Sequence, residues 1–452
     1  MTELFGTDGI RGRVNQYPMT AQCALHMGAA IAHLCKNSRC DSGQCKVFIG
    51  KDTRISGSML ESALVSGICS QGVDAVLVGV IPTPAVAYFT SSMSAHAGIV
   101  ISASHNPYKD NGIKIFDAQG YKLSQEKEQK IENLLLSKDI DKLLCSSDKL
   151  GICYHLYDAL GRYIVFLKNS FSKNYSLDGI KIAIDCANGA TCRVGPSVFS
   201  ELGAQVMPLS VMPTGDNINL NCGSEYPEQL AQYVIEKGMD IGFAFDGDGD
   251  RVIVVDENGQ ILSGDQIIAI CASLLKEEGR LMGNCVVTTI MSNIGLRVAL
   301  EDLGITHLMS DVGDRNVMEM MRAKGACIGG EQSGHLIFFD HHTTGDGIIA
   351  ALQLLICMKK RGEKISELAR IMKVFPQSLM NIEVSQKPSL DTIPEIAAIM
   401  NEIQKQLQDR GRVLVRYSGT QPICRVMVEG PTEEEANNCC TEIAKIIEEK
   451  LS

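Results

Sequence analysis

The chain has 452 residues, of which 45% are hydrophobic and 21% charged, and its formal net charge is −11. This length exceeds what one hydrophobic core usually supports, and the composition is that of a folded protein, so we expect about three or four domains. The negative charge argues against a general nucleic-acid or anionic-membrane surface, because phosphate groups would be repelled. A phosphorylated small molecule would therefore be bound locally, by a few arginines.

The sequence gives no sign of export or membrane insertion. No apolar stretch reaches the ~20 residues of a membrane-spanning helix. The opening MTELFGTDGIRGR lacks the apolar core of a secretory signal. The 17 cysteines form no C-x-x-C pair, so we expect reduced thiols rather than a disulfide scaffold or a zinc ribbon. These features predict a cytoplasmic protein.

Short apolar strands alternate with helices from residue 46 onward. In chain order we expect strand 46–50, helix 57–72, strand 75–80, strand 98–102, strand 181–185, helix 194–203, strand 205–209, helix 227–238, strand 240–245, helix 266–278, strand 285–290, helix 296–303, helix 316–325 and helix 348–361. This alternation predicts right-handed βαβ units and largely parallel sheets.

Turn formers and charges cluster near residues 146–151, 256–264 and 372–377. Beyond these clusters we expect a helix at 393–407, a hairpin over 412–428 and a helix from Glu433. The predicted fold class is α/β, with three domains built on mixed or parallel sheets and a smaller C-terminal α+β domain. The predicted domain boundaries are 1–150, 151–256, 257–372 and 373–452.

The stretch IVISASHNPYKDNGIKIF begins as an apolar strand, and Asn106-Pro107 prevents its continuation. We expect the loop that follows to display Ser104 at the surface as a nucleophile, whereas a plain turn serine is the alternative. Ala103 and His105 flank Ser104, so the chain has no G-x-S-x-G elbow, and it has no Walker A motif. Ser104 is therefore predicted to carry a phosphoryl rather than an acyl group.

A second apolar strand ends in the sequence DGDGDR. The aspartates Asp246, Asp248 and Asp250 alternate with glycines, so they could share one divalent cation through oxygen ligands. An EF-hand loop is an alternative, since Glu257 falls at its twelfth position, but Arg251 replaces the required glycine and the flanks are strand-like. An acidic surface turn is the remaining alternative.

A third strand end carries CIGGEQSGH. Glu331 and Ser333 alternate along a segment that we expect to be extended, so both can face one side and hydrogen-bond neighbouring hydroxyl groups of a ligand. His335 shares that face as a general base or a charge partner for phosphate. A purely structural histidine is the alternative.

The fourth cluster, RYSGTQPICR, is rich in groups that bind anions. Two guanidinium groups, two hydroxyls and a glycine backbone supply convergent donors for a phosphate. We expect this cluster to hold a phosphate that is not reacting, through Arg416, Ser418, Gly419, Thr420 and Arg425.

Together with the opening FGTDGIRG, these motifs resemble the α-D-phosphohexomutase superfamily over essentially the whole chain. FGTDGIRG and the central NINLNCGS most resemble its phosphoglucosamine branch. The resemblance implies four domains around a central cleft and a resting enzyme in which Ser104 is phosphorylated. It also implies Mg²⁺ held by the three aspartates and one phosphoserine oxygen, and Lys114 as the cleft lysine that handles a proton. Arg11 and Arg251 are the further arginines expected to act in catalysis.

The activity implied by the resemblance is interconversion of glucosamine 6-phosphate and glucosamine 1-phosphate through a bisphosphate, for UDP-N-acetylglucosamine and cell-wall precursor synthesis. A hexose 1,6-bisphosphate is the expected activator. Sugar phosphates, and neither nucleic acid nor membranes, are the expected partners. A phosphomannomutase or phosphoglucomutase is the alternative within the enzyme class, and a non-catalytic sugar-phosphate-binding regulator the alternative outside it. Tyr417 and Gln421 replace the proline and glutamate usual in the family's phosphate loop, and we expect this to affect affinity.

Overall fold

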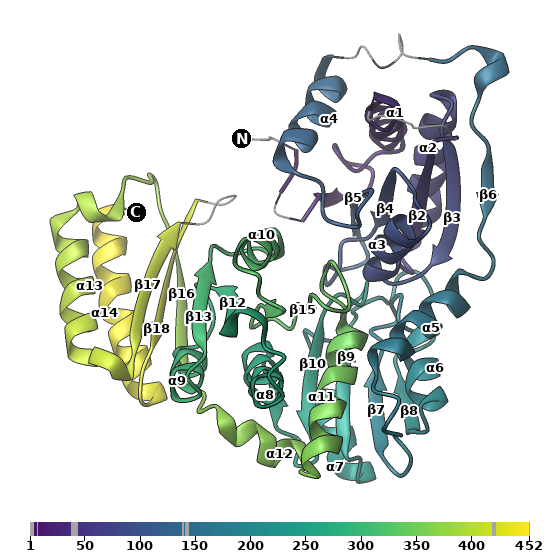
Figure 1. Ribbon diagram of the computed structural model, residues 1–452. Helices are drawn as coiled ribbons and strands as arrows, with labels where there is room; N and C mark the ends of the chain where they lie inside the picture. The colour runs from purple at the N-terminus through teal and green to yellow at the C-terminus, as the bar shows by residue number, and fades with distance from the viewer. Residues whose placement is uncertain are drawn as a thin grey trace. The chain divides into compact units, whose positions relative to one another are not determined.

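The computed structural model describes residues 4–6, 8–37, 44–137, 140, 144–417 and 422–451. The chain forms two compact units, one of Met1–Met291 with Ile305–Arg370 and one of Ser292–Gly304 with Ile371–Ser452. The first unit contains three α/β sheets and the second a three-stranded antiparallel sheet (Figure 1). Among the described helices, none is long and apolar enough to cross a membrane. The predicted α/β fold class is confirmed.

The first sheet and its helices comprise, in chain order, β1 (Ile10–Arg13), α1 (Ala21–Asn37), β2 (Lys46–Lys51), α2 (Gly57–Ser70), β3 (Asp74–Val80), α3 (Thr83–Ser92), β4 (Ala97–Ile101), β5 (Asp110–Asp117), α4 (Gln125–Ser137) and β6 (Cys153–His155). The strand order is β1-β5-β4-β2-β3-β6; β5 pairs antiparallel with both β1 and β4, and the other pairs are parallel. Side chains alternate along β2: Val47 and Ile49 join the cluster under α1 and α2, whereas Phe48 contacts Phe89 of α3. The sheet is thus covered on both faces.

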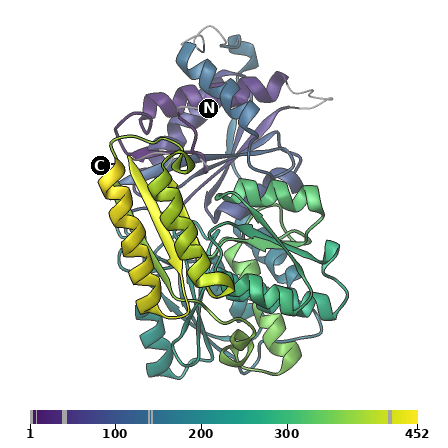
Figure 2. The same ribbon diagram turned by 90° about the vertical axis from the view of Figure 1, so that its left-hand side faces the viewer.

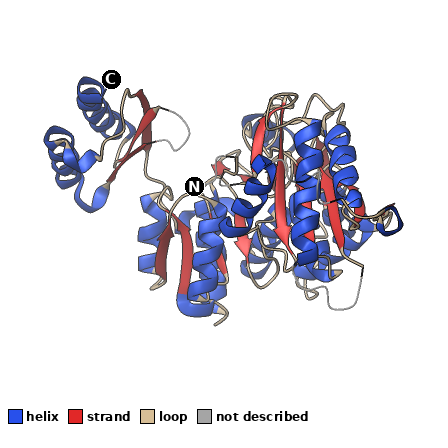
Figure 3. Ribbon diagram, turned by 90° about the horizontal axis from the view of Figure 1, so that it is seen from above, coloured by secondary structure: helices blue, strands red, loops and turns tan. Residues whose placement is uncertain are grey.

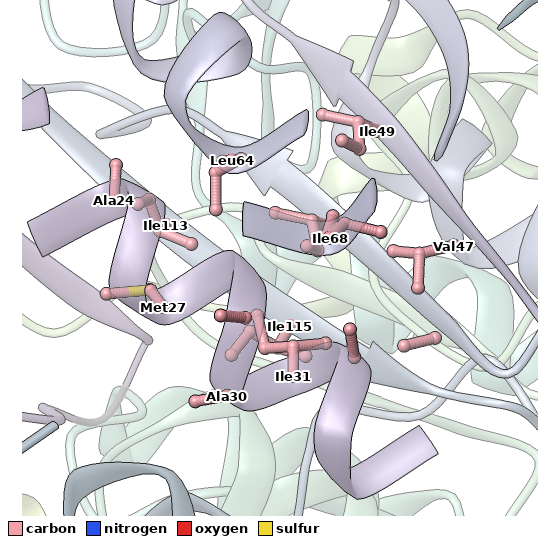
Figure 4. Packing of buried hydrophobic residues seen from close by; sticks show 14 of the residues in the cluster. Ala24, Met27, Ala30, Ile31, Val47, Ile49, Leu64, Ile68, Ile113 and Ile115 are labelled. Carbon is pink, nitrogen blue, oxygen red and sulfur yellow. The ribbon is translucent and has the colours of Figure 1, made fainter. Parts of the chain in front are cut away.

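Helices α1 and α2 approach each other through two glycines. A Cβ atom at Gly28 would lie 2.4 Å from the carbonyl oxygen of Leu64, and one at Gly67 would lie 2.0 Å from that of Leu25. Only glycine permits this approach of the two backbones. Beside the helix contact, apolar side chains pack onto β2 and β5 (Figure 4), among them Ala24, Met27, Ala30, Ile31, Val47, Ile49, Leu64, Ile68, Ile113 and Ile115.

The second sheet and its helices comprise α5 (Ala159–Ser170), β7 (Lys181–Asp185), α6 (Val194–Glu201), β8 (Gln205–Leu209), α7 (Glu228–Lys237), β9 (Ile241–Phe245), β10 (Val252–Asp256) and β11 (Ile261–Leu262). The strand order is β11-β10-β9-β7-β8, in which β9, β7 and β8 are parallel and β10 and β11 antiparallel. Leu230 and Val234 of α7 join one buried cluster with Ala244, and Phe199 of α6 stacks on Phe243. Apolar side chains on both faces keep β9 buried along its whole length.

The third sheet and its helices comprise α8 (Gly264–Glu277), β12 (Cys285–Thr289), β13 (Thr306–Ser310), α10 (Asp314–Lys324), β14 (Ile328–Gly330), β15 (Leu336–Phe338), α11 (Gly347–Arg361) and α12 (Ile365–Leu368). The strand order is β13-β12-β14-β15, with β15 antiparallel to β14. Asp346 caps α11 by accepting the backbone N–H groups of Ile348 and Ile349, and it also accepts the hydroxyl of Tyr163 at 2.6 Å. This hydrogen bond connects α11 to α5.

The second unit comprises α9 (Ile294–Asp302), β16 (Gln377–Glu383), α13 (Pro394–Leu407), β17 (Arg412–Tyr417), β18 (Ile423–Glu429) and α14 (Glu433–Leu451). Its sheet has the order β16-β18-β17 and is antiparallel throughout. Helices α13 and α14 run side by side along this sheet (Figure 2) and cover the same face of it (Figure 3). The predicted hairpin and both predicted helices are confirmed here.

The prediction of mixed or parallel sheets is confirmed, and each of the three sheets in the first unit contains antiparallel pairs. Antiparallel hairpins join β4 to β5, β9 to β10 and β14 to β15. Strands buried on both faces read as apolar runs whichever way they pair, so the sequence pattern does not reveal the direction. These three hairpins matter for function because their loops carry three of the predicted motifs.

Cysteine oxidation differs from the prediction at one residue. Fifteen described cysteines are free, whereas Cys45 is disulfide-bonded. The expectation of reduced thiols is therefore wrong for Cys45. Disulfide formation depends on the distance and direction of two Cβ atoms in space, which composition does not specify.

We predict that Gly67→Ala destabilises the protein, although alanine is ordinarily ~1 kcal/mol better than glycine inside a helix. The added methyl group would meet the Leu25 carbonyl oxygen at 2.0 Å, and overpacking of this kind costs about 1–3 kcal/mol. Thermal unfolding measures the effect. Gly161→Ala in α5 is the control, because its Cβ would meet nothing within 4 Å, and it should leave the midpoint unchanged or raise it. A Gly67→Ala protein as stable as the wild type would contradict the close helix contact.

Candidate functional site

Three hairpin loops meet within the first unit and bring the predicted motifs together. The β4–β5 loop holds Ser104, the β9–β10 loop holds the three aspartates and the β14–β15 segment holds His335. The Ser104 hydroxyl donates to Asp246 Oδ2 at 2.5 Å. Arg251 pairs with His335 in an isolated β-bridge. Motifs from distant parts of the sequence thus share one site.

Ser104 is only 1% exposed, so the prediction that its loop displays it at the surface is wrong. The aspartate loop covers it, and the local pattern around Ser104 does not reveal that contact. Its φ of +52° lies in the left-handed region that is unfavourable for residues other than glycine. The backbone N–H of Ser104 donates to Ser102 Oγ at 2.9 Å. Ser104 is therefore both buried and conformationally constrained.

His105, next in the chain, also faces the Ser104 hydroxyl. Its Nδ1 lies 3.3 Å from Ser104 Oγ. Burial, and then the positive charges of Arg251 and Arg11, lower the pKa of His105 to about 4. The imidazole is therefore neutral at neutral pH and adds no positive charge beside the serine.

An arginine and an aspartate from the segment after β2 hold the serine loop. Asp52 accepts from Arg54 Nε at 2.8 Å and from Ser102 Oγ at 2.7 Å. The Arg54 guanidinium donates, at distances of 2.5 to 3.1 Å, to the carbonyl oxygens of Ser104, Asn106, Pro107 and Asp110. Arg54 is itself buried. The serine loop is therefore held by side chains that follow β2, a strand of the same sheet.

The three aspartates form a buried cluster whose oxygens lie within 4.8 Å of one another. Burial, and then the charges of Asp250 and Asp248, raise the pKa of Asp246 well above its usual range. The Oδ1 atoms of Asp248 and Asp250 are buried without a hydrogen-bond partner. Converging carboxylate oxygens without donors fit a divalent cation. The EF-hand alternative fails, because strands flank the loop and Glu257 accepts from Ser366 instead.

Lys114 lies on β5, as predicted, and compensates the charge of this cluster. Its Nζ donates to Asp248 Oδ2 at 2.8 Å and to Asp250 Oδ2 at 3.0 Å, and lies 2.9 Å from Asp8 Oδ2. Burial alone would lower the pKa of Lys114, but the three carboxylates raise it well above its usual value. Burial would likewise raise the pKa of Asp250, but Lys114 brings it to about 2. Lys114 is thus held as an ammonium group.

Arg11 reaches the serine loop from β1. Its Nη1 donates to the Ala103 carbonyl oxygen at 3.3 Å and to Asn106 Oδ1 at 3.2 Å, and its Nη2 pairs with Asp8. Burial by itself would lower the pKa of Arg11, but the nearby charge of Asp8 outweighs this effect and raises the pKa. Asp8 also pairs with Lys122, so this one carboxylate connects several cations around the site.

His335 is buried, and neither of its ring nitrogens has a hydrogen-bond partner. Its Nε2 lies 3.4 Å from Asp314 Oδ2, and Asp314 also pairs with Lys122. These three side chains line a cavity of about 110 Å³. Among the described residues, His335 Nδ1 thus has no hydrogen-bond partner, and Nε2 has a close contact to the Asp314 carboxylate without a hydrogen bond.

The segment around Glu331 and Ser333 is a turn, so its predicted extended conformation is wrong. Glu331 accepts from Gly334 N through its carbonyl at 3.0 Å and donates from its own N–H to the His335 carbonyl at 2.9 Å. Gly334 has a φ of +90°, which lets the chain reverse between β14 and β15. Glu331 Oε1 accepts from the Gly313 N–H at 3.1 Å, whereas Ser333 is exposed.

Arg251 follows the aspartate cluster directly. Burial by itself would lower the pKa of Arg251, but the charges of Asp250 and Asp246 outweigh burial and raise this pKa above its usual value. Its Nη1 lies 3.9 Å from Glu225 Oε1, too far for a hydrogen bond. The guanidinium is therefore permanently charged and keeps donors available for an anionic ligand.

In the second unit, Arg416 and Arg425 occupy directly opposite positions on β17 and β18. Burial and the charge of Arg425 lower the pKa of Arg416. Like charges at opposed positions destabilise a sheet unless an anion lies between them. Arg425 Nε is buried and has no partner among the described residues, and Tyr417 packs on the apolar cluster of this unit. The other predicted members of this cluster, Ser418, Gly419 and Thr420, lie outside the described residues, as does Gln421.

Sequence reasoning did not assign roles to Asp8, Arg54, Lys122 or Asp314. Asp8 lies within FGTDGIRG, and Arg54 and Asp314 follow strand ends, so the rule that selected Ser104 pointed to Arg54 and Asp314 but not to Asp8. Lys122 is recognised only by its partners, because both carboxylates that it pairs with come from distant segments.

Models of the phosphoglucomutase/phosphomannomutase family match most of the chain. The α/β/α domain I model matches residues 2–141, domain II residues 161–259, domain III residues 263–375 and the C-terminal domain residues 379–446. Two similar proteins are both named phosphoglucosamine mutase. The one from Syntrophus aciditrophicus is 58% identical, with 100% of each chain covered, and the one from Syntrophobacter fumaroxidans is 53% identical, with 99% of each covered.

Solved structures share the fold at low sequence identity. A phosphoglucomutase/phosphomannomutase family protein from Burkholderia thailandensis has a TM-score of 0.80 at 22% identity, covering 99% of this chain and 98% of its own. The Aspergillus fumigatus N-acetylphosphoglucosamine mutase in complex with GlcNAc-6P and magnesium has a TM-score of 0.69 at 17% identity, covering 100% and 96%.

We predict that Asp248→Asn weakens divalent-cation binding by about tenfold or more, because it removes one of three charged ligands. Titration with Mn²⁺, followed by electron paramagnetic resonance, measures the affinity without any assay of turnover. Asp256→Asn is the control, because Asp256 is equally buried but accepts turn N–H groups from Asn258 and Gln260. Equal Mn²⁺ affinity of Asp248→Asn and wild type would exclude a cation at the cluster.

Proposed function

The chain belongs to the phosphoglucomutase/phosphomannomutase family, and we propose that it interconverts glucosamine 6-phosphate and glucosamine 1-phosphate. The observation that carries this choice is its full-length similarity to proteins named phosphoglucosamine mutase. It is an isomerase that works as an intramolecular phosphotransferase. We also propose that the protein is cytoplasmic and that its product is used to synthesise UDP-N-acetylglucosamine.

Ser104 is the proposed phosphoryl carrier. In the first half-reaction the bond between phosphorus and Ser104 Oγ breaks, while the free hydroxyl oxygen of a bound hexose monophosphate bonds to phosphorus and loses its proton. The product is a hexose bisphosphate and a serine hydroxyl. In the second half-reaction the other phosphate returns to Ser104, and the sugar oxygen that releases it is protonated. The buried, constrained position of Ser104 beside Asp246 supports this role.

The three aspartates and an oxygen of phosphorylated Ser104 are the proposed ligands of Mg²⁺, which would neutralise charge on the transferring phosphoryl group. The unpartnered oxygens of Asp248 and Asp250 support this assignment. Lys114 is the residue proposed to handle a proton at the attacking sugar hydroxyl, and Asp248, Asp250 and Asp8 hold its side chain beside the cluster. A hexose 1,6-bisphosphate would place the first phosphoryl group on Ser104.

The remaining residues are proposed to bind the sugar phosphate. Glu331 and Ser333 would accept from and donate to sugar hydroxyls, and His335, with both ring nitrogens unpartnered, would bind phosphate or move a proton. Arg11 and Arg251 would balance charge around the transferring group. Anchoring of the non-reacting phosphate is assigned to Arg416, Ser418, Gly419, Thr420 and Arg425. The opposed pair Arg416 and Arg425 supports this part of the proposal.

We predict that Ser104→Ala abolishes turnover and takes up no phosphoryl group, because it lacks the only atom to which that group is transferred. Intact-protein mass spectrometry after incubation with glucose 1,6-bisphosphate and Mg²⁺ measures the modification directly. Ser102→Ala, which keeps Ser104, is the comparison and should still be phosphorylated. Wild-type protein that binds sugar phosphate but never gains a phosphoryl group would favour the regulator alternative.

We predict the highest kcat/KM for glucosamine 6-phosphate among the 6-phosphates of glucosamine, glucose and mannose. Discrimination should be incomplete, because exchanging one amine for a hydroxyl keeps most of the hydrogen bonds of the site. Coupled assays of the three substrates, each primed with its own bisphosphate, measure the ratio. A clear preference for mannose or glucose 6-phosphate would replace the amino-sugar assignment by the phosphomannomutase or phosphoglucomutase alternative.

A further inference from the structure

Asn219 contacts the serine loop from a different part of the chain than Arg54. It lies in the NINLNCGS segment between β8 and α7, and its side chain is buried. Its Nδ2 donates to the Ser104 carbonyl oxygen at 2.9 Å and to the Asn106 carbonyl oxygen at 3.0 Å. This contact joins the segment between β8 and α7 to the serine loop after β4.

Arg54 and Asn219 bind the same two carbonyl groups. Arg54 Nη2 donates to the Ser104 carbonyl at 2.9 Å and to the Asn106 carbonyl at 2.7 Å. A carbonyl oxygen has two lone pairs, so the two side chains together satisfy both acceptors fully. The backbone of the serine loop is therefore held from two different parts of the first unit.

The conformation of Ser104 requires such support. Its φ of +52° is unfavourable for a serine, and unfavourable backbone conformations persist only where the surrounding structure over-determines them. Arg54 alone fixes the loop to the first sheet. Asn219 belongs to the same sheet domain as the aspartate loop, so its contact adds to the Ser104–Asp246 hydrogen bond in fixing the serine loop relative to Asp246.

Gly247, in the aspartate loop, packs closely against the contact between Asn219 and the Ser104 carbonyl oxygen. A Cβ atom at Gly247 would lie 2.6 Å from the Ser104 carbonyl oxygen and 2.9 Å from Asn219 Nδ2. The glycine thus leaves room for the amide to reach the carbonyl beside Asp246. Asn219 itself has a φ of +58° and donates its backbone N–H to the Ala187 carbonyl at 2.9 Å. Asparagine tolerates this backbone conformation better than most residues and supplies a neutral donor.

From these contacts we propose that Asn219 is a positioning residue that fixes the Ser104 hydroxyl relative to the aspartate cluster. This inference rests on the proposed function, in which Ser104 accepts and donates a phosphoryl group. Misplacement of a reacting atom by about 1 Å can cost on the order of 100-fold in rate. Asn219 should therefore affect the transfer step more than substrate binding.

Asn219→Gly is the direct test, because glycine keeps the positive φ but removes the amide donor. We expect kcat to fall about 10- to 100-fold with KM changed by less than about threefold. The single-turnover rate of Ser104 phosphorylation by glucose 1,6-bisphosphate, read by mass spectrometry, should fall in parallel. Asn219→Asp should behave in the same way, because a carboxylate cannot donate a hydrogen bond to the carbonyl oxygens of Ser104 and Asn106.

Asn221→Gly is the matched control. Asn221 lies in the same segment with a φ of +52° but is exposed, so its variant should keep the wild-type rates. Rates are expressed per folded molecule, with the folded fraction taken from urea unfolding. Hydrogen exchange should also be faster at the amides of residues 104–106 in Asn219→Gly and not in Asn221→Gly.

The outcomes separate this inference from the proposed function. If wild-type protein is phosphorylated and Asn219→Gly matches Asn221→Gly in both rate and exchange, the positioning role is wrong while the function stands. A larger KM with unchanged kcat would also overturn it, since that pattern reports substrate binding. Wild-type protein that is never phosphorylated at Ser104 would overturn both.

Discussion

Three carboxylates buried within 4.8 Å of one another are the constraint on which the site depends. Negative charges this close raise the free energy of the folded state unless cations offset them. Lys114 supplies one positive charge from β5, and Arg251 supplies another from the same loop as the aspartates. Among the described residues, the oxygens of the cluster include two that have no donor, which fits a further cation at the cluster. Such a cation would serve both the stability of this loop and the proposed phosphoryl transfer.

The position of Ser104 follows from that cluster. Its hydroxyl donates to Asp246, and its unfavourable φ is supported by two side-chain donors, Arg54 and Asn219, to its own carbonyl oxygen. A flexible serine would sample many distances from the aspartates, whereas this one is held in place before substrate arrives. Such preorganisation lowers the cost of reaching the transition state.

The phosphate recognition proposed for the second unit obeys a different rule. Arg416 and Arg425 lie opposite each other on adjacent strands and repel. An anion between them converts this repulsion into two charge-assisted interactions. Tyr417, which replaces the proline usual in the family, packs on the apolar cluster of its own unit. The packing of Tyr417 gives the end of β17 an anchor that the sequence comparison alone did not suggest.

The sequence by itself determined the α/β class, most helices and strands, and the residues of the serine, aspartate and arginine motifs, because these depend on local periodicity and on polar residues that follow apolar strands. Only the tertiary structure decided that Ser104 is buried, that the Glu331 segment turns, and that antiparallel hairpins carry the motifs. The partners of Lys122 and Asn219 were likewise invisible, since they come from distant segments. Local patterns encode which side chain a strand end presents, whereas burial and pairing depend on which other segments cover it.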